Sequence, residues 1–184
     1  MKTLCLRCFY DLKPQYFRFT IDGIRGFAIY PYEQEFQSLL YLYKGRGDIE
    51  LSSVFLDRIR FLLKVRYQGY TLVYVPSHPS HIQKRGFDHV PLIFLGIGKR
   101  ICCPIIKTED VKQSDQNKKD RRKIGRYLRL VGGNDLKGKK LLLVDDVCTT
   151  GSSLRSCVRL LKKLRPKKIS ILVLAKVFIR GKSP

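Results

Sequence analysis

The 184-residue chain has few acidic residues, no internal repeat, no low-complexity tract and no long apolar run. No segment approaches the roughly 20 apolar residues that a membrane-spanning helix needs, and the first residues lack the apolar core of a signal peptide. From these absences we expect a soluble, cytoplasmic protein with no membrane span. The length suits one domain with at most a small appendage.

The shortage of acidic residues leaves a large positive charge. The chain has 15 Asp and Glu against 37 Lys and Arg, which gives a net charge of +22. A charge of this size favours polyanionic partners, namely nucleic acid, an anionic surface or phosphorylated ligands. The alternative is a solvated basic surface without a partner, because charge provides affinity without defining a site.

Metal-binding pairs are also scarce. Cys5 and Cys8 form half of a zinc knuckle, whereas a closed structural site needs four ligands, and Cys102 and Cys103 are adjacent and far away. The first pair is therefore a remnant, or half of a site that two subunits share, and we predict no zinc. Three histidines lie together, at His78, His81 and His89. Their spacing lacks the i, i+4 pairing of a helical zinc site, so no metal is expected there either.

The stretch 141–153 carries the strongest signal in the chain. Four aliphatic residues lead directly into Asp145 and Asp146, and a Thr-Thr-Gly-Ser-Ser turn follows. The unbroken aliphatic run predicts a parallel strand that is buried on both faces. The Leu and Val spacing after Ser153 predicts an amphipathic helix.

A strand, a loop of small residues and a helix N-terminus together form a cradle for an anion. Free backbone N–H groups point at the anion, and the helix dipole favours it. We expect a phosphate to be held by Thr149, Thr150, Gly151, Ser152 and Ser153. Asp145 and Asp146 cannot bind a phosphate, but they suit hydroxyl groups or a hydrated Mg²⁺ beside it. A phosphate next to a diol is the pattern of a ribose 5-phosphate.

A second anion site is predicted after the strand at 71–75. The polar loop that follows contains Ser77, His78, Lys84 and Arg85. Because open α/β sheets bind ligands at the carboxyl ends of their strands, we expect this loop at the same sheet edge as the aspartates.

The polar, highly charged segment 107–126 cannot bury much surface. It is predicted to be a mobile loop, and either a lid or a plain connection fits its composition.

The remaining patterns complete an α/β fold. We expect a strand at 26–34 that ends at Pro31, helices at 33–43, 50–66 and 87–98, an edge strand at 101–106 interrupted by Pro104, and a last parallel strand at 169–175. These elements predict a central, mostly parallel sheet flanked by helices.

Several motifs resemble those of known families. Val144 to Ser153 resembles the phosphoribosyl pyrophosphate (PRPP) signature of type I phosphoribosyltransferases. Tyr41–Asp48, Val75-Pro76 with Arg85–Asp88, and the spacing of Gln113 and Arg121 extend the resemblance to the ComF family over about residues 28–176. These phosphoribosyltransferase-like proteins are linked to DNA uptake in competent bacteria.

The sequence also departs from the ComF pattern. Members usually open with a four-Cys zinc finger, of which Cys5 and Cys8 remain here. Asp88 and His89 stand where Asn and Gln are usual, and Ile124 replaces an Asn.

The resemblance implies a type I phosphoribosyltransferase-like domain over 26–184, preceded by an appendage at 1–25 with a degenerate half zinc finger. It implies PRPP or ribose 5-phosphate as ligand, with Mg²⁺, a pyrophosphate loop at 77–85, and Gln113 and Arg121 in a mobile loop. Thr149 stands where some purine-salvage relatives carry an acidic base, so no catalytic residue is assigned.

Two functions follow from this. The first is a PRPP-binding protein in natural competence that contacts single-stranded DNA or a DNA-uptake helicase. The second is a transferase that moves ribose 5-phosphate from PRPP to a nucleobase in nucleotide salvage. The sequence leaves the oligomeric state open.

Overall fold

A six-stranded sheet forms the centre of the protein. The structure, a computed structural model, describes residues 12–108 and 127–178. The strands lie in the order β1-β2-β8-β7-β3-β4, and every neighbouring pair is parallel except β1 with β2. Their bounds are Phe17–Ile21 (β1), Ile24–Pro31 (β2), Tyr70–Tyr74 (β3), Arg100–Cys102 (β4), Lys140–Cys148 (β7) and Lys168–Lys176 (β8).

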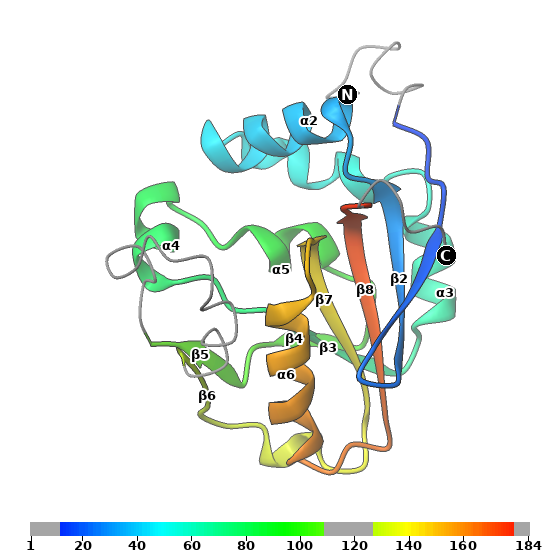
Figure 1. The fold of residues 1–184 in the computed structure, drawn as a ribbon, viewed down its shortest axis with the longest axis vertical. Helices are drawn as coiled ribbons and strands as arrows, with labels where there is room; N and C mark the ends of the chain where they lie inside the picture. Colours follow the sequence, from blue (N-terminus) through cyan, green and yellow to red (C-terminus); the bar gives the residue numbers. More distant parts are fainter. Residues whose placement is uncertain (1–11, 109–126, 179–184) are drawn as a thin grey trace.

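Helices cover both faces of this sheet (Figure 1). Their bounds are Gln34–Gly45 (α2), Arg60–Arg66 (α3), Pro79–Arg85 (α4), His89–Phe94 (α5) and Ser152–Lys162 (α6), with short 3₁₀ turns at Ile49–Ser52 (η1), Val54–Leu56 (η2) and Asn134–Leu136 (η4). One hydrophobic core gathers residues of α2, η1, η2, α3 and α5 against the sheet, and the other gathers those of α6. The sheet and its two helical layers confirm the predicted fold class.

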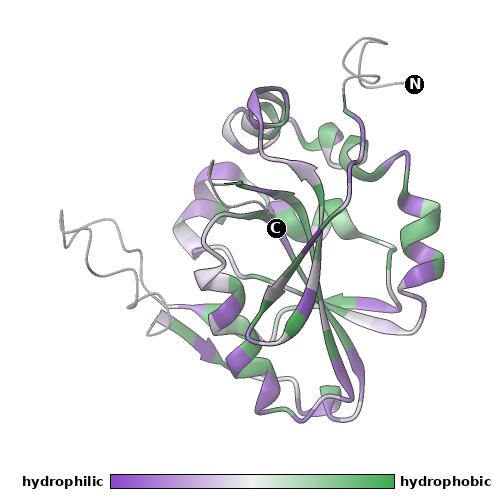
Figure 2. Cartoon of the chain, turned by 45° about the vertical axis from the view of Figure 1, so that its right-hand side comes forward, coloured by the Kyte–Doolittle hydropathy of each residue, from purple (hydrophilic) through white to green (hydrophobic). Residues whose placement is uncertain are grey.

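Strand β7 contributes to both cores. Leu142 and Val144 face the core on the α2 and α5 side, whereas Leu141 and Leu143 face α6, and all four side chains have 0% exposure. Burial on both faces is the reason for the unbroken aliphatic run, because each successive side chain points to the opposite side. Figure 2 shows the same arrangement, with hydrophobic central strands and helices striped by hydrophilic residues. None of the described helices has the length and apolar character that crossing a membrane requires.

The predicted helix 50–66 is wrong in its first half. Two 3₁₀ turns, η1 and η2, replace it, and Ile59 (φ −127°, ψ 0°) separates them from α3. The residues that gave the helical spacing, Leu51, Phe55 and Ile59 among them, are nevertheless buried. Irregular turns can present apolar residues at the same intervals as a helix, so the pattern located the core but not the backbone.

Two further predictions need correction. The predicted helix 87–98 is shortened to α5, His89–Phe94, and Gly96 (φ +77°) follows the end of the helix. The predicted polar loop at 77–85 contains α4, which starts at Pro79 and ends before Gly86 (φ +85°). The helix is favoured because Pro is pre-organised for a first turn and Gly for a left-handed C-terminal residue.

Pro104 divides the predicted edge strand in two. Residues before it form β4, which pairs with β3, and those after it form β5 (Ile105–Lys107), which pairs with β6 (Leu128–Leu130) in a separate two-stranded sheet. A proline cannot donate to a ladder, so a change of partner at this position is expected.

The range predicted as an N-terminal appendage, 1–25, includes β1, which pairs with β2 along one edge of the central sheet. Cys5, Cys8, Gln113 and Arg121 lie outside the described residues.

Candidate active site

The candidate site lies where β7 runs past the end of β3. Strand β3 pairs with β7 as far as Tyr74 opposite Val144, whereas β8 stays paired with β7 as far as Cys148 opposite Lys176. The next residue after β3, Val75, still donates its N–H to the carbonyl of Val144 at 3.0 Å. Asp145 and Asp146 therefore lie just beyond β3, at the sheet edge where ligands bind in open α/β folds.

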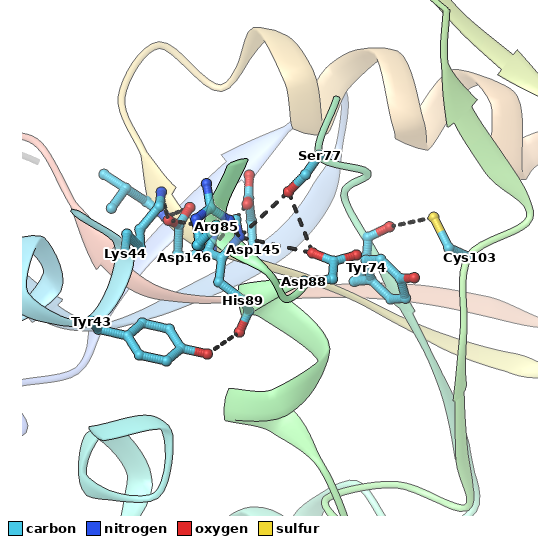
Figure 3. Close-up of polar contacts among 11 residues, drawn as sticks. Tyr43, Lys44, Tyr74, Ser77, Arg85, Asp88, His89, Cys103, Asp145 and Asp146 are labelled. Atoms are coloured by element: carbon cyan, nitrogen blue, oxygen red, sulfur yellow. Dashed lines mark hydrogen bonds and ion pairs between the residues drawn. The ribbon is translucent and has the colours of Figure 1, made fainter. Parts of the chain in front are cut away.

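Asp146 is the centre of a buried polar network (Figure 3). Its Oδ2 accepts from Lys44 Nζ at 2.5 Å and from His89 Nε2 at 3.1 Å, and its Oδ1 accepts from the Val147 N–H at 2.7 Å. Lys44 comes from the last turn of α2 and His89 from the start of α5. The carboxylate thus ties two helices to the sheet edge.

His89 is held as one tautomer. Its Nδ1 lies 2.7 Å from Arg85 Nη1 and its Nε2 faces Asp146. An arginine can only donate, so Nδ1 must accept and Nε2 must carry the proton that it donates to Asp146. The imidazole is therefore neutral. Burial lowers the pKa of His89, in agreement with this assignment, although the hydrogen bond to Asp146 acts in the opposite sense.

The two neighbouring aspartates differ in pKa. Burial opposes the charge on Asp146, but the hydrogen bond from His89 and the Lys44 ammonium outweigh it and hold the pKa of Asp146 well below its usual range. Burial and the adjacent charge of Asp146 raise the pKa of Asp145 well above its usual range. The side chain of Asp145 accepts the Asp146 N–H at 2.9 Å, and no cation is in ion-pair contact with it in the described part of the chain. Asp145 is thus the carboxylate with unused capacity.

Asp88 forms a second, smaller cluster beside His89. Ser77 Oγ lies 3.4 Å from both Asp88 Oδ1 and His89 Nδ1. Burial, with smaller contributions from Cys103 and Asp88, raises the pKa of Tyr74. Ser77 therefore bridges the loop after β3 to the first turn of α5.

The predicted anion cradle is an exposed turn that leads into α6. Gly151 has φ +73° and precedes the first turn of α6, and a Cβ at this position would lie 2.9 Å from Ile21 Cδ1. Thr150 Oγ1 and Ser152 Oγ lie 2.8 Å apart, while Thr149 and Thr150 are exposed. The loop therefore presents hydroxyl groups and the N-terminus of an 11-residue helix on the surface.

The structure brings some of the predicted site residues together. The side chains of Arg85 and Ser77 both lie within hydrogen-bond distance of His89 Nδ1, and His89 in turn donates to Asp146. By contrast, the His78 side chain accepts from the Ser80 N–H within α4, and Lys84 is exposed in the last turn of that helix.

Sequence reasoning missed the roles of Lys44 and His89. Both belong to stretches that carry the ComF resemblance, but their link to Asp146 spans 102 and 57 positions and leaves no local spacing signal.

The carboxylates at the end of β7 are compatible with Mg²⁺ when the phosphates of a ligand supply further oxygen atoms. Among residues 12–108 and 127–178 no group of three or more His, Cys, Asp or Glu side chains could hold a metal ion. Mg²⁺ in phosphate sites is usually held by one or two carboxylates, with water and substrate phosphates completing its shell. Asp145 is the residue with an available carboxylate.

The family follows from a match over residues 60–183 to the phosphoribosyl transferase domain. Because this match covers more than half of the chain, the protein belongs to the phosphoribosyl transferase domain family. Within that family it is ComF-like, as its curated relatives show.

One relative is competence protein ComFC of Streptococcus pneumoniae (strain ATCC BAA-255 / R6), with 29% identity over 147 residues, covering 80% of this chain and 66% of the relative. Another is competence protein ComFC of Bacillus subtilis (strain 168), with 27% identity over 146 residues, covering 78% of this chain and 60% of the relative. The match thus spans about three fifths to two thirds of the relatives' length.

Solved structures with a similar chain course include adenine phosphoribosyltransferase of Saccharomyces cerevisiae (TM-score 0.48, 13% identity, covering 94% of this chain and 90% of the other). A hypoxanthine phosphoribosyltransferase of Staphylococcus aureus is more distant, with a TM-score of 0.38 and 18% identity, covering 70% of this chain and 64% of the other. Similarity at this level carries no argument about the reaction.

Proposed function

We propose that this ComF-like protein binds PRPP with Mg²⁺ and acts on incoming single-stranded DNA in natural competence. The observation that carries the PRPP part is the placement of two features on one strand–loop–helix unit. Asp145 lies near the end of β7 with unused carboxylate capacity, and the Thr149–Ser153 loop opens α6 immediately after that strand. A phosphorylated sugar needs both, namely a cradle for its 5-phosphate and an acceptor for its hydroxyl groups.

Each end of PRPP has a counterpart in this proposal. The 5-phosphate is held by Thr149, Thr150, Gly151, Ser152 and Ser153. The ribose hydroxyls and Mg²⁺ meet Asp145, and bound Mg²⁺ neutralises charge on the pyrophosphate. Arg85 and Lys84 supply positive charge to the pyrophosphate from the end of α4. From the sequence we expected Asp146, like Asp145, to meet hydroxyl groups or Mg²⁺. In the structure Asp146 already holds Lys44 and His89, and so it fixes the position of α2 and α5 around the site.

The DNA part of the proposal rests on two supports. Relatives in Streptococcus pneumoniae and Bacillus subtilis are named competence proteins. The net charge of +22 favours a polyanionic partner. A DNA-uptake helicase is a second partner compatible with the same role.

Calorimetric titration with three ligands tests the PRPP part. With Mg²⁺ present, PRPP should bind more tightly than ribose 5-phosphate or pyrophosphate, because only PRPP can contact both the cradle and the α4 end. Equal affinity for PRPP and ribose 5-phosphate would show that Arg85 and Lys84 do not contact the pyrophosphate. Absence of saturable PRPP binding would overturn the PRPP part. A parallel titration of the same sample with single-stranded DNA tests the DNA part.

A transferase is the second candidate, favoured by membership of the phosphoribosyl transferase domain family. Its test is pyrophosphate release from PRPP–Mg²⁺ in the presence of each common nucleobase. Base-dependent release that is lost in Asp145→Asn would establish turnover. PRPP binding without release for any base would leave the binding protein as the function.

A further inference from the structure

A basic groove lies at the β1 edge of the sheet, away from the aspartates. In the β1–β2 register Arg18 is opposite Phe27 and Thr20 is opposite Arg25, so these four side chains share one face of the ribbon. The other face carries Phe17, Phe19 and Ile24, which pack against the core on the α6 side. Alternation along the two strands has therefore placed the arginines together on one face. This is the face toward α3, because Arg66 of α3 lies over the Phe27 ring.

Helix α3 completes the groove. Its last residue, Arg66, places Cζ 5.0 Å from the centroid of the Phe27 ring, and Arg18 Cζ lies 6.0 Å from the same centroid. The resulting cavity has a volume of about 510 Å³ and is lined by Arg18, Phe19, Thr20, Arg25, Gly26, Phe27 and Arg66. Two guanidinium groups thus contact one aromatic ring, with Arg25 beside them.

The charge of this groove is not neutralised by neighbouring acids. Within residues 12–108 and 127–178, neither Arg18 nor Arg25 nor Arg66 forms an ion pair with a carboxylate, and all three side chains are exposed. The acid of the β1–β2 turn, Asp22, pairs instead with Arg155 and Arg159 on α6. The three guanidinium groups are therefore available to an anionic ligand.

An apolar cavity continues the groove. It has a volume of about 330 Å³ and shares Arg18, Phe27 and Arg66 with the first. Its remaining lining is mostly apolar and consists of Tyr16, Ile29, Ile59, Leu62, Leu63, Tyr67 and Leu172. Tyr16 is 51% exposed and Leu62 is 61% exposed, so flat apolar groups can reach this half from solvent.

We propose that this groove binds single-stranded nucleic acid. Its phosphates pair with Arg18, Arg25 and Arg66, and a base enters the apolar half beside Tyr16. A single strand carries a negative charge and an accessible aromatic face at every nucleotide, which matches the two halves of the groove. A duplex hides its base faces in the stack, and an acidic peptide would leave the apolar half without a partner. The choice of DNA as the nucleic acid rests on the proposed function.

The test replaces the three arginines by glutamine, as Arg18→Gln, Arg25→Gln and Arg66→Gln in one protein. A fluorescent 20-nucleotide oligo-dT is titrated and followed by anisotropy at 0.1 M salt and at several higher salt concentrations. Binding should weaken at least tenfold. The log–log salt slope should become shallower by about 2, because each phosphate that the protein no longer neutralises removes about 0.7 from the slope.

The matched control removes the same charge elsewhere, as Lys137→Gln, Lys163→Gln and Lys167→Gln, all at exposed positions. It should keep affinity within about threefold of the natural sequence. Melting temperature and PRPP affinity verify that both proteins fold. If the triple arginine variant does not fold, Arg25→Gln alone replaces it, because Arg25 is exposed and its substitution should make the slope shallower by about 0.7.

Four outcomes overturn the proposal. Equal losses of affinity in the arginine and lysine variants would show that binding follows total charge. Displacement of the oligonucleotide by poly-glutamate of equal charge would indicate an acidic protein partner instead. Unchanged binding in the arginine variant would show that the groove is not the binding surface, although the proposed DNA role would still hold. Failure of the natural sequence to bind oligo-dT would refute both the groove proposal and the DNA role. PRPP titration is independent of all four.

Discussion

Lys44 and Asp146 lie 102 positions apart in the chain, yet their Nζ and Oδ2 atoms are 2.5 Å apart. The pair joins the last turn of α2 to the end of β7, and His89 adds the first turn of α5 to the same carboxylate. Asp146 is thus tied to two helices before any ligand binds, whereas the side chain of Asp145 accepts the N–H of its neighbour Asp146. Substituting each aspartate in turn separates these roles.

Asp146→Ala should destabilise the protein by roughly 1–3 kcal/mol, because it leaves the donors of Lys44 and His89 without an acceptor in a mostly buried place. Chemical denaturation with urea measures the free energy of unfolding. The matched control is Asp135→Ala, whose partner Arg100 and own side chain are both about half exposed. The control should change stability by at most about 1 kcal/mol. Equal effects in the two variants would contradict the structural role of Asp146.

Asp145→Asn should weaken PRPP–Mg²⁺ at least tenfold, which is about 1.4 kcal/mol, without lowering stability. Because the pKa of Asp145 is raised, Mg²⁺ must compete with a proton there, so affinity should rise with pH as that proton is lost. Calorimetry at several pH values measures both effects. The substituted protein should lose this pH dependence, and the control Asp135→Asn should keep it. A variant with full affinity and unchanged pH dependence would place the metal elsewhere.

The contribution of His89 to stability should fall as the pH drops below about 6.5, the pKa of an unfolded histidine. The folded protein keeps His89 neutral with a lowered pKa, so the unfolded state binds more protons in this range and is favoured. Asp145 acts in the opposite direction, since its raised pKa favours the folded state as acid is added.

His89→Gln isolates the histidine contribution to this pH dependence. Between pH 7 and 5 its stability should change less steeply than that of the natural sequence, by at most about 1.4 kcal/mol per pH unit. Thermal melting across the range measures the slopes. Parallel slopes would mean that His89 titrates alike in the folded and unfolded states, and so contributes nothing to the pH dependence.

Gly151→Ala should cost roughly 1–3 kcal/mol of stability and weaken phosphate binding. An alanine there must adopt φ near +73° and place its Cβ 2.9 Å from Ile21 Cδ1. Gly132→Ala is the control, because nothing lies within 4 Å of a Cβ built at Gly132. Similar melting temperatures for the two variants would show that the turn tolerates a side chain.

Purified protein should carry no stoichiometric zinc, because Cys5 and Cys8 provide two thiolates and a closed site requires four ligands. Elemental analysis measures the metal content. One zinc per chain would refute this prediction, and one per two chains would indicate a site shared between subunits.

The sequence predicted those parts of the fold and site that depend on neighbouring residues. The aliphatic run before Asp145 gave a strand buried on both faces, and the small residues around Gly151 gave the turn into α6. Each depends on local patterning that a few consecutive residues determine.

The remainder depends on residues that are far apart in the chain. The break at Ile59 arises where packing decides between backbone conformations of similar energy. The helix at Pro79 is different, because Pro79 and Gly86 are local signals that the loop prediction overlooked. Lys44 and His89 come together at Asp146 only after three separate elements have packed, so no spacing in the sequence reveals them.

The tautomer of His89 has a consequence for how the site meets an incoming anion. Arg85 donates to a neutral ring nitrogen, and within the described residues it forms no ion pair with a carboxylate. Arg85 can turn toward a pyrophosphate by giving up one hydrogen bond, whereas Lys44 must first break its ion pair with Asp146. Arg85 is therefore the cation of this network that can reach an incoming polyphosphate without breaking an ion pair, while Lys44 keeps α2 attached to Asp146.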